Sequence, residues 1–239
     1  MNPILSSLFA VSIGYVLGSI PFGYLITKVS TGKNILKIGW RKTSGSNVFR
    51  NIGFWQGFLT GILDVGKGFL AVWLAKNFGF SPQIQALSGV AAVTGHNWSI
   101  FLKFAGGRGI GTFFGAFLAL SPKILGFSII PLAFLALIWN ASIGTILFLL
   151  TALILATVFN QFQILTFVLI SLFPIFIKRL SPIGELSLNS PKFSEKFGRV
   201  KKKELIRNRL IFDNDEFCLD LRIKRIIKRL TKKQTLDKL

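Results

Sequence analysis

Long apolar segments recur along the chain, separated by shorter stretches rich in glycine, lysine, arginine and other polar residues. Several of these segments approach the ~20 residues that a helix needs to cross ~30 Å of hydrocarbon. The pattern predicts seven spans, at about residues 4–27, 56–75, 84–102, 109–121, 124–140, 143–159 and 162–177. The fourth is short for a full crossing, so we expect it to be tilted or merged with its loop. The predicted fold is all-α, a polytopic membrane helix bundle.

The composition supports this class and excludes several kinds of site. Hydrophobic residues make up 51% of the chain, and 25 residues are phenylalanine. Cys218 is the single cysteine, which excludes an intrachain disulfide and a cysteine metal cluster. The membrane region offers no constellation of metal-ligating side chains, so we expect neither a metal nor another cofactor. The first apolar segment lacks a cationic leader and a cleavage site, which favours a retained span over a signal peptide.

Lysine and arginine are unevenly distributed between the loops, and this predicts the orientation. The segments after the first and third spans are the most basic, with Lys28, Lys33, Lys37, Arg41, Lys42 and Arg50 in one and Lys103 and Arg108 in the other. The opposite loops have only Lys76 and Lys123. We therefore expect the N-terminus outside and the glycine-rich loops and C-terminal tail in the cytoplasm.

The last part of the chain differs from the rest in composition. Residues 1–180 form the predicted transmembrane domain, and residues 181–239 form a mixed-charge, basic tail. Within the tail, residues 218–230 (CLDLRIKRIIKRL) alternate apolar and basic side chains, as in an amphipathic helix lying on anionic lipid. Nucleic acid could attract the same charge, but lipid headgroups are already within reach of a membrane protein. We expect no nucleic-acid partner.

Two ionisable residues lie within the second span, where an unpaired charge is costly. Asp64 and Lys67 are three residues apart and can form an ion pair on one helix face. One interpretation is a purely structural pair. The other places Lys67 at the cytoplasmic end as a phosphate ligand that Asp64 orients.

The strongest candidate site is the polar hairpin at residues 95–115 (GHNWSIFLKFAGGRGIGTFFG). It contains the single histidine, His96, followed by Asn97. About a dozen residues later come Gly106, Gly107, Arg108 and Gly109. Glycines allow the backbone to approach an anion closely, and a guanidinium can bind phosphate in a bidentate manner. The hairpin therefore predicts a phosphate site at the membrane surface.

Three motifs resemble the bacterial acyl-phosphate:glycerol-3-phosphate acyltransferases, the PlsY family. Residues 15–26 (YVLGSIPFGYLI), which include Ser19, are similar to the family's first span, and residues 63–68 (LDVGKG) to its second. Residues 95–109 resemble the family segment G-H-x-x-P-x-F-L-x-F-x-G-G-K-G, which is the most specific of the three. The resemblance covers about the first 180 residues.

The chain departs from the family pattern at several positions. Aligned without gaps to G-S-G-N-x-G-A-T-N-x-x-R, residues 39–50 match at Gly39, Asn47 and Arg50, with Ser46 replacing threonine. Trp40 and Lys42 stand where the family has serine and asparagine; a gapped alternative starts the loop at residues 43–47. Further along, Ser99 replaces proline and Arg108 replaces lysine. Near the last span, Phe176 occupies the asparagine position, and Glu185 matches the family glutamate.

The resemblance implies an enzyme of phospholipid biosynthesis in the bacterial inner membrane, with its active site facing the cytoplasm. Acyl phosphate and glycerol 3-phosphate would be its substrates, and lysophosphatidic acid and phosphate its products. His96, Ser46 and Asn47 would be catalytic, with His96 or a donor phosphate oxygen accepting the hydroxyl proton. Phosphate would be bound by Arg50, Lys67, Gly106, Gly107, Arg108 and Gly109. Ser19, Asp64, Asn97 and Glu185 are further candidates.

Two other functions fit parts of the sequence. Glycine-broken hairpins with cationic residues also line transport sites, so the chain could move an anionic metabolite. The near absence of ionisable residues in the later spans favours an enzyme over this alternative. A catalytically silent relative that binds lipid is the third reading, motivated by Trp40, Lys42 and Phe176. The acyl-chain preference, the use of acyl-CoA and the oligomeric state stay open.

Overall fold

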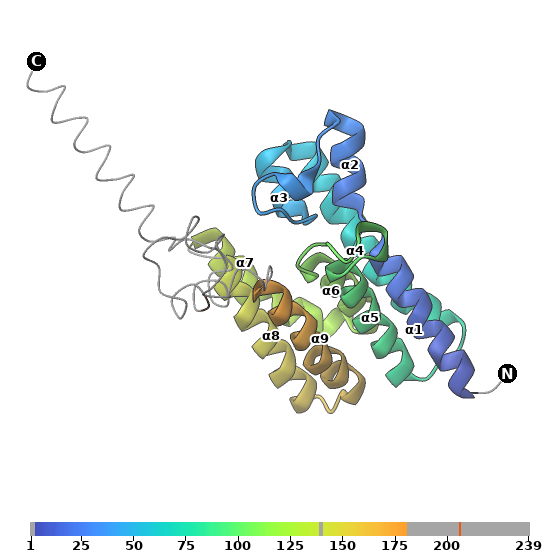
Figure 1. Ribbon diagram of the computed structural model, residues 1–239. Helices are drawn as coiled ribbons and strands as arrows, with labels where there is room; N and C mark the ends of the chain where they lie inside the picture. The colour runs from blue at the N-terminus through green and yellow to red at the C-terminus, as the bar shows by residue number, and fades with distance from the viewer. Residues whose placement is uncertain (1–2, 139–140, 181–205, 207–239) are drawn as a thin grey trace, which may run out of the picture.

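The computed structural model describes residues 3–138, 141–180 and 206 of the 239-residue chain, and the regular elements among these residues are helices (Figure 1). The helices are α1 (Pro3–Ser19), α2 (Phe22–Thr31), α3 (Gly45–Asn51), α4 (Phe54–Asn77), α5 (Pro82–Asn97), α6 (Ile110–Leu120), α7 (Pro122–Ile138), α8 (Ala141–Val158) and α9 (Phe162–Leu180). Two short 3-10 turns, η1 (Ile35–Lys37) and η2 (Ile100–Leu102), lie in the polar loops. The predicted all-α class is confirmed. The tail, including residues 218–230, lies outside the described residues.

The predicted spans correspond closely to helices from the second span onward. The first does not: α1 ends at Ser19, and α2 begins only after Pro21. Proline lacks the backbone N–H that a continuous helix would need there, so the single span predicted for residues 4–27 is corrected to two helices. The third prediction, 84–102, was also too long, since α5 ends at Asn97 and a turn follows.

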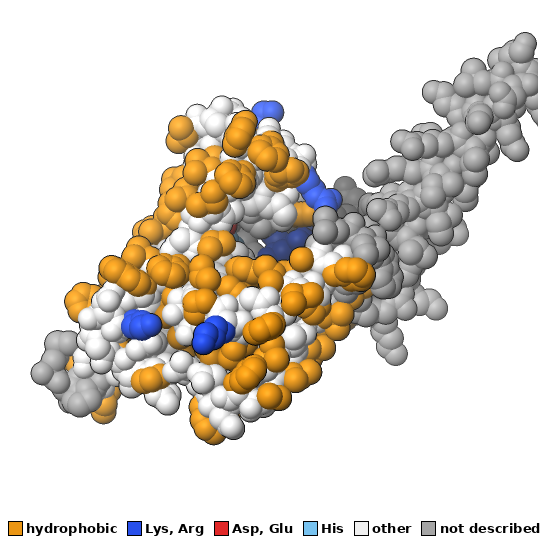
Figure 2. All heavy atoms as spheres, turned by 180° about the vertical axis from the view of Figure 1, so that it is seen from behind, with side chains coloured by type: hydrophobic (Ala, Val, Ile, Leu, Met, Phe, Trp, Pro, Cys, Tyr) orange, Lys and Arg blue, Asp and Glu red, His pale blue; other side chains and the backbone are white. Residues whose placement is uncertain are grey.

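Three helical stretches in the described residues are long and apolar enough to cross a bilayer, namely Ile4–Thr31, Phe54–Asn77 and Phe162–Leu180. The first of these includes the break at Pro21. Shorter apolar helices at Ile110–Leu120, Pro122–Phe134 and Ile143–Val158 lie beside them. Many large apolar side chains point outward over the helices (Figure 2). This surface is typical of a protein solvated by lipid.

An aromatic cluster joins the second half of the bundle. The Phe113 ring stacks on that of Phe167 with centroids 4.7 Å apart and meets Phe148 edge-on at 5.8 Å. These rings come from α6, α9 and α8, and each is fully buried. The cluster packs these three helices together and so fixes the position of the α6 N-terminus.

Close helix packing brings α4 against α6. A Cβ atom on Gly115 would collide with the Val65 carbonyl, so glycine is required at this contact. Small residues serve this purpose in membrane bundles, where backbones approach closely. The contact sets the start of α6 beside Asp64, where a Cβ on Gly111 would lie 3.4 Å from the Asp64 Cβ.

Candidate active site

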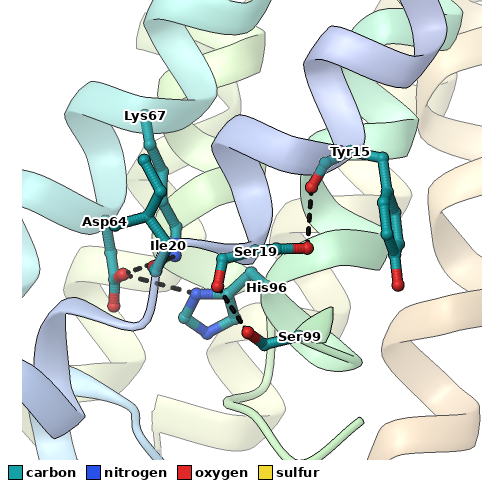
Figure 3. A network of polar contacts seen from close by, with 7 residues as sticks. All are labelled: Tyr15, Ser19, Ile20, Asp64, Lys67, His96 and Ser99. Atoms are coloured by element: carbon teal, nitrogen blue, oxygen red, sulfur yellow. Dashed lines mark hydrogen bonds and ion pairs between the residues drawn. The ribbon is translucent and has the colours of Figure 1, made fainter. Parts of the chain in front are cut away.

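A buried acid lies between a cation and an imidazole (Figure 3). The Asp64 Oδ1 atom is 3.0 Å from the Lys67 Nζ atom and 3.3 Å from the His96 Nδ1 atom. All three side chains are almost completely buried. The Lys67 ammonium also donates a 2.8 Å hydrogen bond to the Ile20 carbonyl at the break between α1 and α2. Asp64 thus compensates the buried ammonium and contacts the imidazole at once.

The contact with Asp64 orients the histidine. A carboxylate beside Nδ1 favours the tautomer that has its proton on Nδ1 and an acceptor lone pair on Nε2. Gly107 lies against that second nitrogen, since a Cβ there would collide with Nε2. Only glycine at 107 therefore leaves room for this nitrogen of the ring.

A pocket of about 570 Å³ opens beside this pair. It is lined by residues from α3, α4, α5, α6, α8 and α9, so that the first basic loop, the second span and the polar hairpin meet in one place. Three arginines line it, namely Arg50, Arg108 and Arg179, together with His96 and Asp64. Figure 2 shows the corresponding hollow, with Lys and Arg side chains deep inside it. The pocket therefore brings His96, Arg50 and Arg108 together.

The first polar loop contributes Ser46 and Arg50 to the pocket wall. Asn47 is instead fully buried beneath the loop. Its side-chain NH₂ donates to the carbonyls of Lys42 and Ile38 at 2.8 and 3.2 Å, and its Oδ1 accepts from the Trp40 backbone N–H at 3.0 Å. These bonds fix the backbone of residues 38–42. The amide predicted to act on substrate is engaged in holding the loop.

The glycine-rich segment has two separate tasks. Gly106 and Gly107 are buried under His96, where a Cβ on Gly106 would collide with the carbonyls of His96 and Asn97. Gly109 lines the pocket and has φ = 78°, a conformation that favours glycine. It caps α6, whose first residues Ile110 and Gly111 also line the pocket. The unpaired N–H groups of a helix N-terminus attract anions.

The side chains of Ser19 and Asn97 donate hydrogen bonds to backbone carbonyls and do not line the pocket. The Ser19 hydroxyl donates to the Tyr15 carbonyl at 2.8 Å, and the Ser19 carbonyl accepts a 2.5 Å bond from the Ser99 hydroxyl (Figure 3). The Asn97 amide donates to the Pro174 carbonyl in α9 at 2.8 Å. These contacts join α1 to the loop at Ser99, and α5 to α9. Glu185 lies outside the described residues.

Three features of the site were not predicted. The pairing of Asp64 with His96 joins α4 to α5, and Arg179 reaches the pocket from the C-terminal end of α9. The Trp40 indole contacts both loop arginines. A lone acid in an apolar span was a usable signal for the first, because it must find partners.

The fold and pocket define an integral membrane protein with an acid–histidine pair in a cationic site, an arrangement suited to reactions of phosphate-bearing substrates. The model of the family described as "Glycerol-3-phosphate acyltransferase" matches residues 8–187. The chain belongs to this family.

Individual relatives agree with the family match. A glycerol-3-phosphate acyltransferase of Prochlorococcus marinus (strain MIT 9312) is 37% identical over 147 residues, which are 60% of this chain and 75% of the relative. The crystal structure of PlsY, an integral membrane glycerol 3-phosphate acyltransferase, in its glycerol 3-phosphate form matches with a TM-score of 0.67 and 29% identity. The match covers 80% of this chain and 99% of PlsY. The lysophosphatidic acid form gives 0.65 and 28%, covering 83% and 97%.

Proposed function

We propose that the chain, as a glycerol-3-phosphate acyltransferase that forms lysophosphatidic acid, takes its acyl group from an acyl phosphate. The observation that supports a phosphate-bearing donor is the set of three arginines around the acid–histidine pair. Two substrates that each have a phosphate place at least two dianionic groups in one pocket. Three guanidinium groups and a helix N-terminus offset most of that charge.

His96 is the proposed general base. Its Nε2 atom takes the proton of the glycerol 3-phosphate 1-hydroxyl while the hydroxyl oxygen attacks the acyl carbonyl carbon. The bond from that carbon to the phosphate oxygen then breaks, and inorganic phosphate leaves with the bonding electron pair. Asp64 orients the ring and stabilises the imidazolium that forms. Phosphate is a good leaving group, so a covalent acyl-enzyme is unnecessary.

Charge stabilisation and positioning fall to the rest of the pocket. Arg108 and the α6 N-terminus contact the acyl phosphate, and Arg50 and Arg179 contact the phosphate of the acceptor. Ser46 supplies a hydroxyl at the pocket wall. Asn47 acts indirectly by fixing the loop that presents Arg50, and Lys67 by keeping Asp64 ionised. Such fixed donors act mainly on the transition state.

The acyl chain enters from the lipid through the aromatic side of the pocket. Phe49 and Phe58 line it and are about half exposed, at 49% and 51%. The neighbouring Phe54 and Trp55 rings, 5.1 Å apart, are exposed as well. Aromatic residues gather at the membrane interface. In this proposal the cluster therefore lies at the interface, with the phosphate of the donor in the pocket and its acyl chain in the lipid.

The pocket faces the cytoplasm in this proposal, because its loops have the most basic residues. Single cysteines introduced into a Cys218→Ser background test the orientation. Lys33→Cys is expected to resist an impermeant maleimide added to intact cells, and Asn77→Cys to react with it. Labelling of Lys33→Cys alone would place the pocket outside.

The donor is tested with purified protein in lipid. Lysophosphatidic acid is expected from glycerol 3-phosphate with acyl phosphate, and little or none with acyl-CoA. Formation with acyl-CoA alone would contradict the proposed donor. Proteoliposomes that take up glycerol 3-phosphate without any donor would favour a transporter. Equal turnover in Arg108→Ala and wild type would contradict the proposed site.

A further inference from the structure

One indole lies against two of the three pocket arginines. The Arg108 Cζ atom is 4.5 Å from the centroid of the Trp40 ring, and the Arg50 Cζ atom is 4.9 Å from the same centroid. Both distances are within the range of a cation–π contact. The two guanidinium carbons therefore cannot be farther apart than the sum of these distances. Trp40 sets an upper limit on the separation of two cations that come from different loops.

The position of Trp40 is itself fixed by the fold. Its backbone N–H donates to Asn47 Oδ1, and the Asn47 amide binds the carbonyls on either side, at Ile38 and Lys42. Asn47 is fully buried in α3. The backbone of Trp40 is thus held against α3, the helix that contains Arg50. Arg108 contacts the indole from the loop before α6.

Two cations this close repel each other when the pocket is empty. The negative face of an indole offsets part of that repulsion, and it does so without occupying the N–H groups that bind phosphate. A guanidinium is planar and stacks on an aromatic ring, whereas an ammonium is a compact, strongly hydrated charge. Arginine at 108 and tryptophan at 40 therefore suit each other. Both are positions where the sequence departs from the PlsY pattern.

We propose that Trp40 is a positioning residue, which holds Arg50 and Arg108 at the spacing required by the phosphates of the two substrates. This inference rests on the proposed function. Arg179 makes the same type of contact at a longer distance and with a smaller ring, since its Cζ lies 5.5 Å from the ring centroid of Phe176. In this chain aromatic faces support the pocket arginines at two positions where the family pattern has serine and asparagine.

The first test separates substrate binding from turnover. Trp40→Leu is expected to raise KM for acyl phosphate and for glycerol 3-phosphate about tenfold each, because each substrate phosphate then loses the one partly buried cation–π contact that holds its arginine. Trp40→Phe keeps an aromatic face and is expected to stay within about threefold of wild type. The turnover number kcat should change little in either variant. The control is Trp73→Leu, because Trp73 is 45% exposed on α4 and lies outside the pocket lining.

A second test leaves the shape of the side chain almost unchanged, so it applies even if Trp40→Leu fails to fold. Fluorinated tryptophans placed only at position 40 weaken the negative face step by step. KM is expected to rise with each added fluorine. A KM that is independent of fluorination, or equal in Trp40→Leu and wild type, would overturn the inference. A wild-type protein inactive with acyl phosphate would instead overturn the proposed donor.

The third test asks whether the two departures act together. Arg108→Lys alone and Trp40→Ser alone are each expected to raise KM. The double variant, which restores the family residues, is expected to be less impaired than the product of the two single effects predicts. Strict multiplication of the single effects would show that the indole and guanidinium act independently, and would contradict their coupling.

Discussion

His96 and Asp64 link α5 to α4 at the pocket, with the Nδ1 and Oδ1 atoms 3.3 Å apart. Both side chains are at most 5% exposed. The imidazole thus has one nitrogen beside a carboxylate and the other beside Gly107, and His96 lines the pocket. The carboxylate of Asp64 orients the imidazole as a proton acceptor, so this task requires no metal ion.

Removal of the imidazole is the direct test of this arrangement. His96→Ala is expected to lower kcat by about 10²–10⁴, the usual contribution of a general base, with a smaller effect on KM. His96→Gln, which keeps a hydrogen-bonding side chain but has no basic nitrogen, should be equally slow. Steady-state kinetics with acyl phosphate measure both. Wild-type turnover in either variant would exclude His96 as the base.

Asp64 has two roles, which a pair of variants can separate. Asp64→Asn removes the charge that compensates Lys67. Breaking a buried ion pair in this way typically costs about 3–5 kcal/mol of stability. Asp64→Asn combined with Lys67→Met removes both charges. This double variant is expected to recover most of the lost thermal stability in detergent but little activity. Full recovery of activity would reduce Asp64 to a structural role.

Gly107 should tolerate no side chain, because a Cβ atom there collides with His96 Nε2. Gly107→Ala is expected to lower kcat strongly by displacing the ring. The matched control is Gly66→Ala in α4, where a Cβ would meet no atom within 4 Å. The control should keep wild-type activity and gain slightly in stability, since alanine favours helix. Similar kinetics in both variants would contradict the placement of the ring.

Ser99 tests the contact behind the pocket. Its hydroxyl donates to the Ser19 carbonyl and accepts from the Phe101 backbone N–H at 3.2 Å. Ser99→Ala is expected to reduce stability by about 1 kcal/mol, the net value of a buried hydrogen bond, and to leave KM almost unchanged. Thermal unfolding and kinetics measure the two effects. A large rise in KM without loss of stability would instead place Ser99 at the substrate.

Chelation provides a further check. Among the described residues there is no group of three or more metal-ligating side chains of His, Cys, Asp and Glu. We expect lysophosphatidic acid formation to survive excess EDTA and to be unaffected by added divalent cations. Loss of activity on chelation, restored by one metal, would contradict the proposed mechanism.

The sequence predicted helix positions well where hydrophobic runs are long, because length and polarity decide them. It failed at Pro21, where a single residue divides an otherwise apolar run. Among the site residues, His96 and Arg108 could be found from their local motif. The role of Asn47 could not, because its partners are backbone carbonyls whose positions depend on the folded loop. Long-range pairs such as Asp64 with His96 depend on helix packing, which periodicity does not encode.

The interruption of the first span has an effect on the neighbouring helix. In an unbroken helix, the Ile20 carbonyl would accept the amide of Tyr24; here that amide bonds to Pro21, and the Ile20 carbonyl accepts the Lys67 ammonium. Replacement of Pro21 by alanine would let the two segments fuse and withdraw that acceptor. The ammonium would then depend on Asp64 alone and pull the carboxylate away from the imidazole. The break between α1 and α2 thereby affects how Asp64 holds the His96 imidazole in α5.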